Sequence, residues 1–190
     1  MCKKVDRIYD LGEIMKNIVI RKVKPEDAKQ FITLRNFVWR DAYKHIFPEE
    51  VFDERENNLS EMIDAFSSRF YNDNTKMVYV AEYKGEIIGY ISAKSTSNYD
   101  YYFDKGYAEI MAIYIHPMYQ GRGIGSKFKN VFLDWAKKNG ITKFVIGVLK
   151  DNFKARKVYE KWGCNLDDYT QSFVQLGVSY DEVFYTYNLD

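Results

Sequence analysis

Apolar residues near the start of the chain follow first the spacing of a strand and then that of a helix. Residues 18–23 form a short β-branched run, and the segment Lys-Pro-Glu-Asp at 24–27 follows it. This segment is typical of a helix start, because proline fits the first turn and the acids face the positive end of the helix dipole. Over 28–43 the apolar residues recur at helical spacing. The pattern predicts a strand followed by a helix that ends near residues 45–48.

The middle of the chain predicts a second helix and an antiparallel hairpin. Apolar residues recur at helical spacing over 59–70, and Asn-Asp-Asn at 72–74 stops this pattern. Two apolar runs, 77–82 and 86–91, flank a Gly-containing turn, which indicates a β-hairpin. Residues 94–105 are rich in Ser, Asn, Asp and Tyr, and we expect them to form an exposed loop.

The second half of the chain alternates strands and helices and closes with a hairpin. Its predicted elements are, in order, a strand at 107–115, a helix from 124 to a stop at Asn139-Gly140, a strand at 143–149, a helix from Asn152 to Gly163, and hairpin strands at 169–176 and 180–189. No repeat, low-complexity tract or linker interrupts them. We therefore expect residues 18–190 to form a single α/β domain with a mixed sheet, preceded by an N-terminal extension at 1–17.

Composition and charge exclude several classes of protein without naming a partner. The 190 residues carry 28 Lys and Arg against 27 Asp and Glu, a net charge of +1, so no strong field favours nucleic acid or an anionic membrane. Cys2 and Cys164 have no Cys-x-x-Cys or Cys/His cluster beside them, which argues against a disulfide scaffold and a structural zinc site. The N-terminus lacks the apolar run of a signal peptide, and no stretch approaches the ~18 apolar residues of a membrane span. We expect a cytoplasmic protein.

A glycine-rich segment, QGRGIGSK at 120–127, lies between the strand at 107–115 and the following helix. Glycines allow the backbone to pass close to a ligand, so that successive N–H groups face one concavity. The helix behind them adds about half a positive charge at its N-terminus. Such a segment binds phosphate, and Arg122 and Lys127 bring cations suited to a diphosphate.

Two common phosphate loops fit this segment poorly. A Walker loop needs Gly-x-x-x-x-Gly-Lys-Ser/Thr, which Gly121 and Ser126-Lys127 do not match, and no magnesium-binding acid is placed downstream. A dinucleotide loop needs Gly-x-Gly-x-x-Gly after the first strand, whereas here the order is Gly-x-Gly-x-Gly after the fourth predicted strand.

The segment at 120–125 resembles the Gln/Arg-x-x-Gly-x-Gly/Ala signature of the GNAT superfamily, the Gcn5-related N-acetyltransferases. A second pattern of that family, Asn-x-x-Ala-x-x-x-Tyr-x-x-x-Gly, is matched by Asn152, Ala155, Tyr159 and Gly163. The order of predicted elements over 18–189 is similar as well. One departure is Cys164, where family members usually have phenylalanine, and we expect it to alter packing more than chemistry.

The resemblance implies a fold, an activity and a co-substrate. The implied fold is a mixed, mostly antiparallel central sheet of about seven strands flanked by about four helices. The implied activity is transfer of an acetyl group from acetyl-CoA to a primary amine by direct attack in a ternary complex, with no metal. The resemblance points to the bacterial branch that acetylates polyamines and other small amines, while a protein N-terminus or an antibiotic amine stays open as the acceptor.

The resemblance also implies coenzyme contacts in three parts of the chain. The loop residues that would hold the pyrophosphate are Gln120, Gly121, Arg122, Gly123, Ile124, Gly125 and Ser126. The main chain of the preceding strand would hold the thioester and pantetheine at Ile113, Tyr114 and Ile115. We expect apolar substitution of those side chains to be nearly silent. Asn152 is a helix N-cap on local grounds and a coenzyme or acceptor contact by resemblance.

Two residues are candidates for proton transfer. Acetyl transfer requires a neutral amine, but alkyl ammonium groups titrate at about 10.4, so a base or a chain of waters has to take a proton. Glu109, on the strand ahead of the loop, is a candidate base, and a structural strand-end carboxylate is the alternative. Tyr159 matches the family's general acid, which protonates the departing thiolate, although its spacing alone places it on the apolar face of its helix.

The first helix and the segment after it carry candidates for the acceptor site. The aromatic candidates are Trp39 and Tyr43, with Phe47 beyond them, and the acids near them are Asp41, Glu49 and Glu50. An aromatic and acidic wall suits a cationic amine. Alternatively, these aromatic residues pack the helix.

The sequence predicts the kind of partner but leaves two other functions open. We expect a small-molecule amine as the acceptor, no nucleic acid and no membrane, and leave open a homodimer. The first alternative function is an acyl-CoA-binding sensor that keeps the glycine loop without turnover. The second is a nucleotide-binding module.

Overall fold

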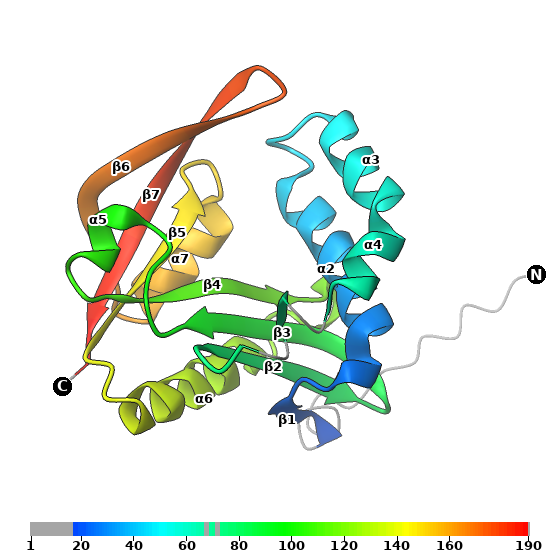
Figure 1. Ribbon diagram of the computed structural model, residues 1–190, viewed down its shortest axis with the longest axis horizontal. Helices are drawn as coiled ribbons and strands as arrows, with labels where there is room; N and C mark the ends of the chain where they lie inside the picture. Colours follow the sequence, from blue (N-terminus) through cyan, green and yellow to red (C-terminus); the bar gives the residue numbers. More distant parts are fainter. Residues whose placement is uncertain (1–16, 67–68, 71–72, 190) are drawn as a thin grey trace, which may run out of the picture.

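A seven-stranded mixed sheet forms the centre of the computed structural model, which describes residues 17–66, 69–70 and 73–189 (Figure 1). The strands are β1 (Val19–Lys22), β2 (Lys76–Tyr83), β3 (Glu86–Lys94), β4 (Ala108–Ile115), β5 (Lys143–Leu149), β6 (Asn165–Gln175) and β7 (Val178–Asn188). They lie in the order β1-β2-β3-β4-β5-β7-β6. Neighbours are antiparallel except β4 and β5, which are parallel. The predicted mixed, mostly antiparallel sheet is confirmed. The predicted extension at 1–17 lies outside the described residues, apart from Asn17.

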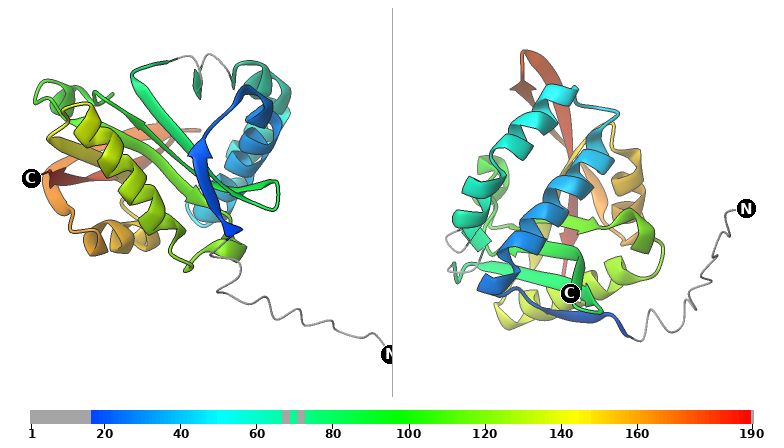
Figure 2. Two further views of the ribbon diagram at one scale, coloured as in Figure 1. Left: turned by 90° about the horizontal axis from the view of Figure 1, so that it is seen from below. Right: turned by 90° about the vertical axis from the view of Figure 1, so that its right-hand side faces the viewer.

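Helices cover both faces of the sheet (Figures 1 and 2). The α-helices of the described segments are α2 (Ala28–Tyr43), α3 (Glu49–Asn57), α4 (Leu59–Asp64), α5 (Asp100–Phe103), α6 (Ile124–Lys138) and α7 (Phe153–Lys161). Helices α2, α3 and α4 lie on one face, and α6 lies on the other (Figure 2). Two short 3-10 helices, Pro25–Asp27 and Pro117–Tyr119, lead into longer elements.

Alternating side chains give each face of the sheet its own hydrophobic core. In β2, Met77 and Ala81 belong to the cluster that α6 covers, whereas Val78 and Val80 belong to the cluster that α2 covers. Side chains at successive strand positions point to opposite faces, so a strand covered on both sides is apolar along its length. This accounts for the apolar hairpin sequences that predicted β2 and β3.

The parallel pair β4 and β5 is joined only at its beginning. Ala108 pairs with Phe144 and Glu109 pairs with Val145. Beyond these residues β4 stays paired with β3 alone, and β5 stays paired with β7 alone. The two strands therefore diverge toward their C-terminal ends, as Figure 1 shows. The backbone of β4 after Glu109 has no strand partner on its β5 side among the described residues.

A β-bulge in β4 changes which side chains share a face. Ser92 of β3 pairs with Ala112, and the next β3 residue pairs with Ile110, so Met111 is an extra residue without a partner. Ile110 lies in the core that α6 covers, whereas Ala112 and Tyr114 pack against the core that α2 covers. Because Met111 shifts the alternation, Glu109 and Tyr114 lie on the same face of β4.

Three predictions of local structure were incomplete. Helix α3 was missed because its sequence is mostly charged, with only Val51 and Phe52 buried. The helix predicted over 59–70 corresponds to α4, which ends at Asp64. The loop predicted as exposed at 94–105 contains the short helix α5, whose Tyr102 is fully buried against Val145 and Phe184. A four-residue helix is too short to show a helical period.

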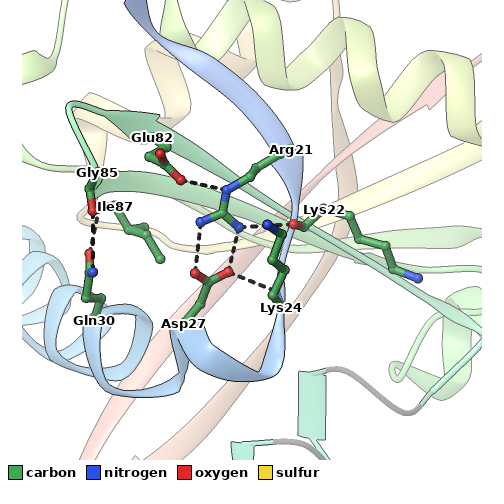
Figure 3. A network of polar contacts seen from close by, with 8 residues as sticks. All are labelled: Arg21, Lys22, Lys24, Asp27, Gln30, Glu82, Gly85 and Ile87. Carbon is green, nitrogen blue, oxygen red and sulfur yellow. Dashed lines mark hydrogen bonds and ion pairs between the residues drawn. The ribbon is translucent and has the colours of Figure 1, made fainter.

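An ion-pair network fixes the start of α2 on the sheet (Figure 3). The Arg21 guanidinium donates to both carboxylate oxygens of Asp27, at 2.6 and 2.8 Å, and to Glu82 Oε2 at 2.7 Å. The Lys24 N–H also donates to Asp27 Oδ2, at 2.8 Å. Burial opposes ionisation of Asp27, but the hydrogen bonds from Arg21 and Lys24 outweigh it and lower the pKa of this carboxyl. The network thereby holds β1, β2 and the beginning of α2 together.

Candidate active site

The turn between β4 and α6 presents free backbone amides. Gly121 and Gly123 have φ angles of +73° and +75°, a left-handed conformation that side chains disfavour. Gly123 is the N-cap of α6 and has no side chain with which to cap the helix. Within the described part of the chain, no backbone carbonyl accepts a hydrogen bond from the amides of residues 121–126. Amides in this arrangement at a helix N-terminus are the groups with which proteins bind anions.

Neighbouring side chains support this turn in different ways. The Gln120 Nε2 donates to the Ile115 carbonyl at 2.9 Å, which ties the turn to the end of β4. Ile124 is 1% exposed and belongs to the core, so it offers only its backbone to a ligand, whereas Ser126 is exposed. A Cβ added to Gly125 would lie 3.7 Å from Trp162 and 3.8 Å from the Ile115 side chain, so α6, α7 and β4 meet closely here.

Arg122 adds a cation to the turn. Its guanidinium lies 5.7 Å from the centre of the Tyr119 ring, and its buried Nη1 has no hydrogen-bond partner among the described residues. A buried donor without a partner costs free energy unless a ligand or water accepts from it. The residues of this turn therefore fit the diphosphate of a coenzyme A molecule.

A second group of predicted residues meets where β4 and β5 diverge. This central polar cluster consists of Tyr43 from α2, Tyr114 from β4, Asn152 at the start of α7, and Tyr159 within α7. The Tyr43 and Tyr114 hydroxyls are 3.0 Å apart. Asn152 Oδ1 accepts from the Ala155 N–H at 3.2 Å, as expected of an N-cap, and the Asn152 side chain also hydrogen-bonds with Tyr43. Three separate elements, α2, β4 and α7, thus supply polar groups to one place.

Tyr159 is held in this cluster as a neutral phenol. Its side chain is 9% exposed, and its ring packs against Tyr185 and Trp162, with centroids 5.8 and 6.1 Å away. No described residue forms a hydrogen bond with its hydroxyl. Burial raises the pKa of Tyr159, and the nearby Tyr43 and Cys164 add to the rise. The hydroxyl therefore keeps its proton at neutral pH.

Tyr114 has a role that sequence reasoning missed. Ile113 and Ile115 pack against the core that α6 covers, as an apolar strand predicts. Tyr114 instead points to the α2 side, where burial raises the pKa of its hydroxyl and the neighbouring Tyr43 adds to the rise. We expected an apolar substitution of Tyr114 to be nearly silent, but its buried hydroxyl lies 3.0 Å from that of Tyr43, which that expectation did not consider. Only a contact between residues 71 positions apart reveals the hydroxyl pair.

Glu109 lies apart from the central polar cluster. Its Oε2 accepts from the Asn98 N–H at 2.7 Å, the Asn98 side chain at 3.1 Å and the Ser97 hydroxyl at 3.4 Å. Burial raises the pKa of the Glu109 carboxyl, and the bonds from Asn98 and Ser97 act against that rise. At about 3.3 Å per residue, Glu109 lies roughly 16 Å before Tyr114 along β4. The carboxylate holds the 97–98 segment on β4, and its role as a base stays a prediction.

A cavity of about 290 Å³ adjoins one member of the cluster, Tyr43, whose ring centre lies 5.2 Å from that of the lining residue Trp39. Helices α2, α3 and α4 form its walls together with the end of the β6–β7 hairpin, and its lining residues are Trp39, Phe47, Val51, Glu54, Arg55, Asn58, Met62, Phe173 and Gln175. Trp39, a predicted acceptor residue, stacks on Phe47 at 5.2 Å and carries the Arg55 guanidinium 4.2 Å from its ring centre. In this structure the cation that contacts the Trp39 ring is therefore Arg55, where a cationic amine was expected.

The acids expected beside the aromatic residues do not line this cavity. Asp41 pairs with Lys44 at 2.7 Å, and Glu49 pairs with Arg40. Glu50 is exposed in the first turn of α3. The predicted aromatic and acidic wall is therefore aromatic without those acids.

Other expectations concern cysteine, metal and membrane. Cys164 is 6% exposed, and burial raises the pKa of its thiol to about 11, so it packs as a small protonated side chain. In the described ranges no three His, Cys, Asp or Glu side chains come together as a metal site would require. No helix within those ranges is long and apolar enough to cross a membrane.

The amide-lined turn and the buried Tyr159 phenol are features expected of the class that the sequence resembles, the N-acetyltransferases. Comparison with known proteins agrees with this class. The family model described as "Acetyltransferase (GNAT) family" matches residues 33–164. The chain therefore belongs to the acetyltransferase (GNAT) family.

Individual relatives are distant in sequence and similar in fold. The L-methionine sulfoximine/L-methionine sulfone acetyltransferase of Salmonella typhimurium is 27% identical over 103 residues, which are 54% of this chain and only 57% of that protein. The structure of PaiA N-acetyltransferase from Thermoplasma acidophilum in complex with coenzyme A has a TM-score of 0.66 at 22% identity, covering 90% of this chain and 98% of that chain. YncA from Salmonella typhimurium, solved with its cofactor acetyl-CoA, has a TM-score of 0.62 at 20% identity, covering 92% and 95%.

Proposed function

We propose that this chain transfers an acetyl group from acetyl-CoA to the primary amine of a small molecule, by direct attack in a ternary complex. The observation that carries the proposal is the Tyr159 hydroxyl, which is neutral and unpartnered among the described residues where β4 and β5 diverge. A phenol in that state can supply a proton to a leaving group.

The coenzyme side of the site follows from the turn at 120–126. Its amides and Arg122 would hold the diphosphate, and the main chain of Ile113 to Ile115 would hold the pantetheine arm and thioester. Acetyl-CoA supplies an activated acyl group and a thiolate leaving group. Asn152 caps α7 and hydrogen-bonds with Tyr43, so it keeps the acceptor-side and coenzyme-side helices in register.

The reaction needs two proton transfers, one from the acceptor nitrogen and one to the coenzyme sulfur. As the acceptor nitrogen forms its bond to the acyl carbon and the carbon–sulfur bond breaks, the nitrogen loses a proton and the sulfur gains one. Tyr159 Oη gives the proton to sulfur. Glu109, or a chain of waters that ends there, takes the proton from nitrogen, and its raised pKa makes it a stronger base than an ordinary carboxylate.

A small amino compound is the acceptor that the comparisons favour. The Salmonella relative is named for two amino-acid analogues, which are small primary amines. The resemblance pointed to polyamines and other small amines, and an acidic wall near Trp39 would suit such a cation, but Asp41 and Glu49 are paired with Lys44 and Arg40 instead. A protein N-terminus and an antibiotic amine are further alternatives. A homodimer, a cytoplasmic location and the absence of a metal stay predictions.

Release of free thiol tests the proposal. Purified protein is incubated with acetyl-CoA and a panel of amino acids, polyamines, aminoglycosides and N-terminal peptides, and free coenzyme A is measured together with the acetylated product. We expect thiol release that depends on at least one amine. If coenzyme A binds tightly and no amine releases thiol, the chain is an acyl-CoA sensor and the proposal is wrong.

A further inference from the structure

Two arginines beside the cavity have no acidic partner. Arg35 of α2 and Arg55 of α3 are both partly buried, and neither forms an ion pair with any described residue. The Nε atom of each is buried and has no hydrogen-bond partner there. Asn36 Oδ1, which lies next to Arg35 in sequence, is a third buried polar atom without a partner. Such groups call for a ligand or water that satisfies them.

The other arginines of the same region behave differently. Arg21 pairs with Asp27 and Glu82, and Arg40 pairs with Glu49 and Glu56. Burial lowers the pKa of both Arg35 and Arg55; the charge of Arg55 adds to the fall for Arg35, whereas Glu54 acts against it for Arg55. An arginine stays charged even so, and a buried cation without a counter-ion is costly. Arg35 and Arg55 place two such charges beside the cavity.

The position of the arginines connects them to the candidate active site. Arg55 lines the cavity, and Arg35 Nη2 donates to the Sδ atom of Met62, another lining residue, at 3.0 Å. Both guanidinium groups are also close enough to the Tyr114 hydroxyl to interact with it electrostatically. Tyr114 belongs to the central polar cluster with Tyr159. A negative group bound at the arginines and an amine at the cluster can therefore belong to one small molecule.

We infer that the acceptor is an amino carboxylate, an amino acid or a close analogue, whose carboxylate binds Arg55 and Arg35 while its amine faces the end of β4. This inference rests on the proposed function and names its substrate class. A guanidinium matches a carboxylate with paired hydrogen bonds, and a carboxylate beside Arg55 and Arg35 would balance their charge. The same arginines disfavour a polyamine, which would bring further positive charge.

The rest of the lining sets the kind of side chain that fits. Trp39, Val51 and Phe173 make much of the wall apolar, which suits an amino acid with an apolar side chain. Glu54 also lines the cavity, but its side chain is exposed and forms no ion pair with Arg55 among the described residues. One solvated acid against two partly buried arginines leaves the site positive.

Matched pairs of acceptors test the carboxylate directly. The common L-amino acids are compared with their primary amides and with spermidine, and kcat and KM are measured by thiol release. An amide has the less basic amine and so offers more free base at neutral pH, which makes the comparison conservative. We expect at least one amino acid to exceed its amide about 10- to 100-fold in kcat/KM, as the loss of a hydrogen-bonded charge predicts.

Variants assign that preference to the two arginines. Arg55→Gln and Arg35→Gln should each raise the KM of the amino acid about 10-fold or more, while kcat, the KM of the amide and coenzyme affinity change little. Arg55→Lys should restore part of the preference. The matched control is Arg40→Gln on α2, because Arg40 already has acidic partners and does not line the cavity. It should leave the preference unchanged.

Thermal unfolding gives a readout that does not depend on turnover. A purely structural arginine would lower the melting temperature when replaced, whereas replacing an unpaired buried charge should leave it unchanged or raise it. The amino acid should raise the melting temperature of the wild type and not that of Arg55→Gln.

The outcomes separate this inference from the proposed function. If amides or spermidine react as well as amino acids, the inference is wrong and the acetyltransferase proposal stands. If no amine reacts, the proposed function fails, and the melting experiment decides the inference. Stabilisation of the wild type alone by an amino acid then supports it, and no such stabilisation overturns it.

Discussion

Replacing Tyr159 with phenylalanine removes one hydroxyl and leaves the packing of the ring unchanged. The hydroxyl has no hydrogen-bond partner within the described part of the chain, and the ring contacts to Tyr185 and Trp162 survive the substitution. We therefore expect the free energy of unfolding to change by less than about 0.5 kcal/mol. The affinity for coenzyme A should also stay nearly the same, because the amides that would bind it lie at 121–126.

The expected loss is in turnover. Proton donation by a positioned side chain contributes about 10²- to 10⁴-fold to a rate. The leaving group here is an alkyl thiol, and such thiols are far more acidic than alcohols (cysteine titrates at about 8.5), so it can depart as the thiolate and the lower end applies. We expect kcat to fall about 10- to 100-fold, which corresponds to about 1.4 to 2.7 kcal/mol in the barrier.

The pH profile adds a second check on Tyr159. A phenol acts as an acid only below its pKa, and burial raises the pKa of Tyr159 above the ordinary value of about 10. Between pH 7 and pH 9 its titration should therefore cause no fall in kcat. Tyr102→Phe is the matched control, because Tyr102 is a buried tyrosine that packs with Val145 and Phe184 and does not belong to the cluster. Unchanged kcat in Tyr159→Phe would refute the assignment of the acid.

Three further predictions concern the turn, the strand acid and the network at α2. Gly121→Ala should raise the KM for acetyl-CoA about 10-fold, because a side chain at a φ of +73° costs about 1 to 2 kcal/mol; Gly140→Ala, at +65°, should leave that KM unchanged. If Glu109 is the base, kcat/KM falls as the pH drops through its raised pKa. Glu109→Gln should abolish this acid limb of the pH profile. If the limb persists in the variant, another group is the base. Asp27→Asn should lower the free energy of unfolding by about 2 kcal/mol at pH 7. Because the pKa of Asp27 is lowered by folding, its contribution is present above the ordinary value near 3.8 and is lost as pH falls through the folded value, so urea unfolding of wild type and variant should converge in acid.

Local patterns in the sequence predicted the elements that carry the coenzyme turn. The strand at 107–115, the helix from 124 and the strand at 143–149 agree closely with β4, α6 and β5. Each has a long apolar period and clear glycine or proline signals at its ends, so its type follows from a few neighbouring residues. Asn152 was predicted as an N-cap for the same local reason, and its Oδ1 accepts from the Ala155 N–H.

The acceptor side could not be predicted in this way. Helix α3 buries only two residues, so no apolar period marks it. Arg35 and Arg55 look like ordinary surface residues in the sequence, and only their packing shows that no acid accompanies them. The bulge at Met111 depends on how β4 pairs with β3, which no spacing within β4 reveals. Contacts between distant segments decide these features.

The extra residue in β4 has a consequence for how this strand can change. Glu109 and Tyr114 are separated by an odd number of positions, so in an uninterrupted strand they would point to opposite sides of the sheet. Deleting Met111 would remove the extra residue and leave Glu109 and Tyr114 four positions apart, so that regular alternation alone would keep both on the α2 side. The strand can therefore lose the residue at the bulge without reorienting either end, whereas losing a paired residue while the bulge remains would turn Tyr114 away from Tyr43.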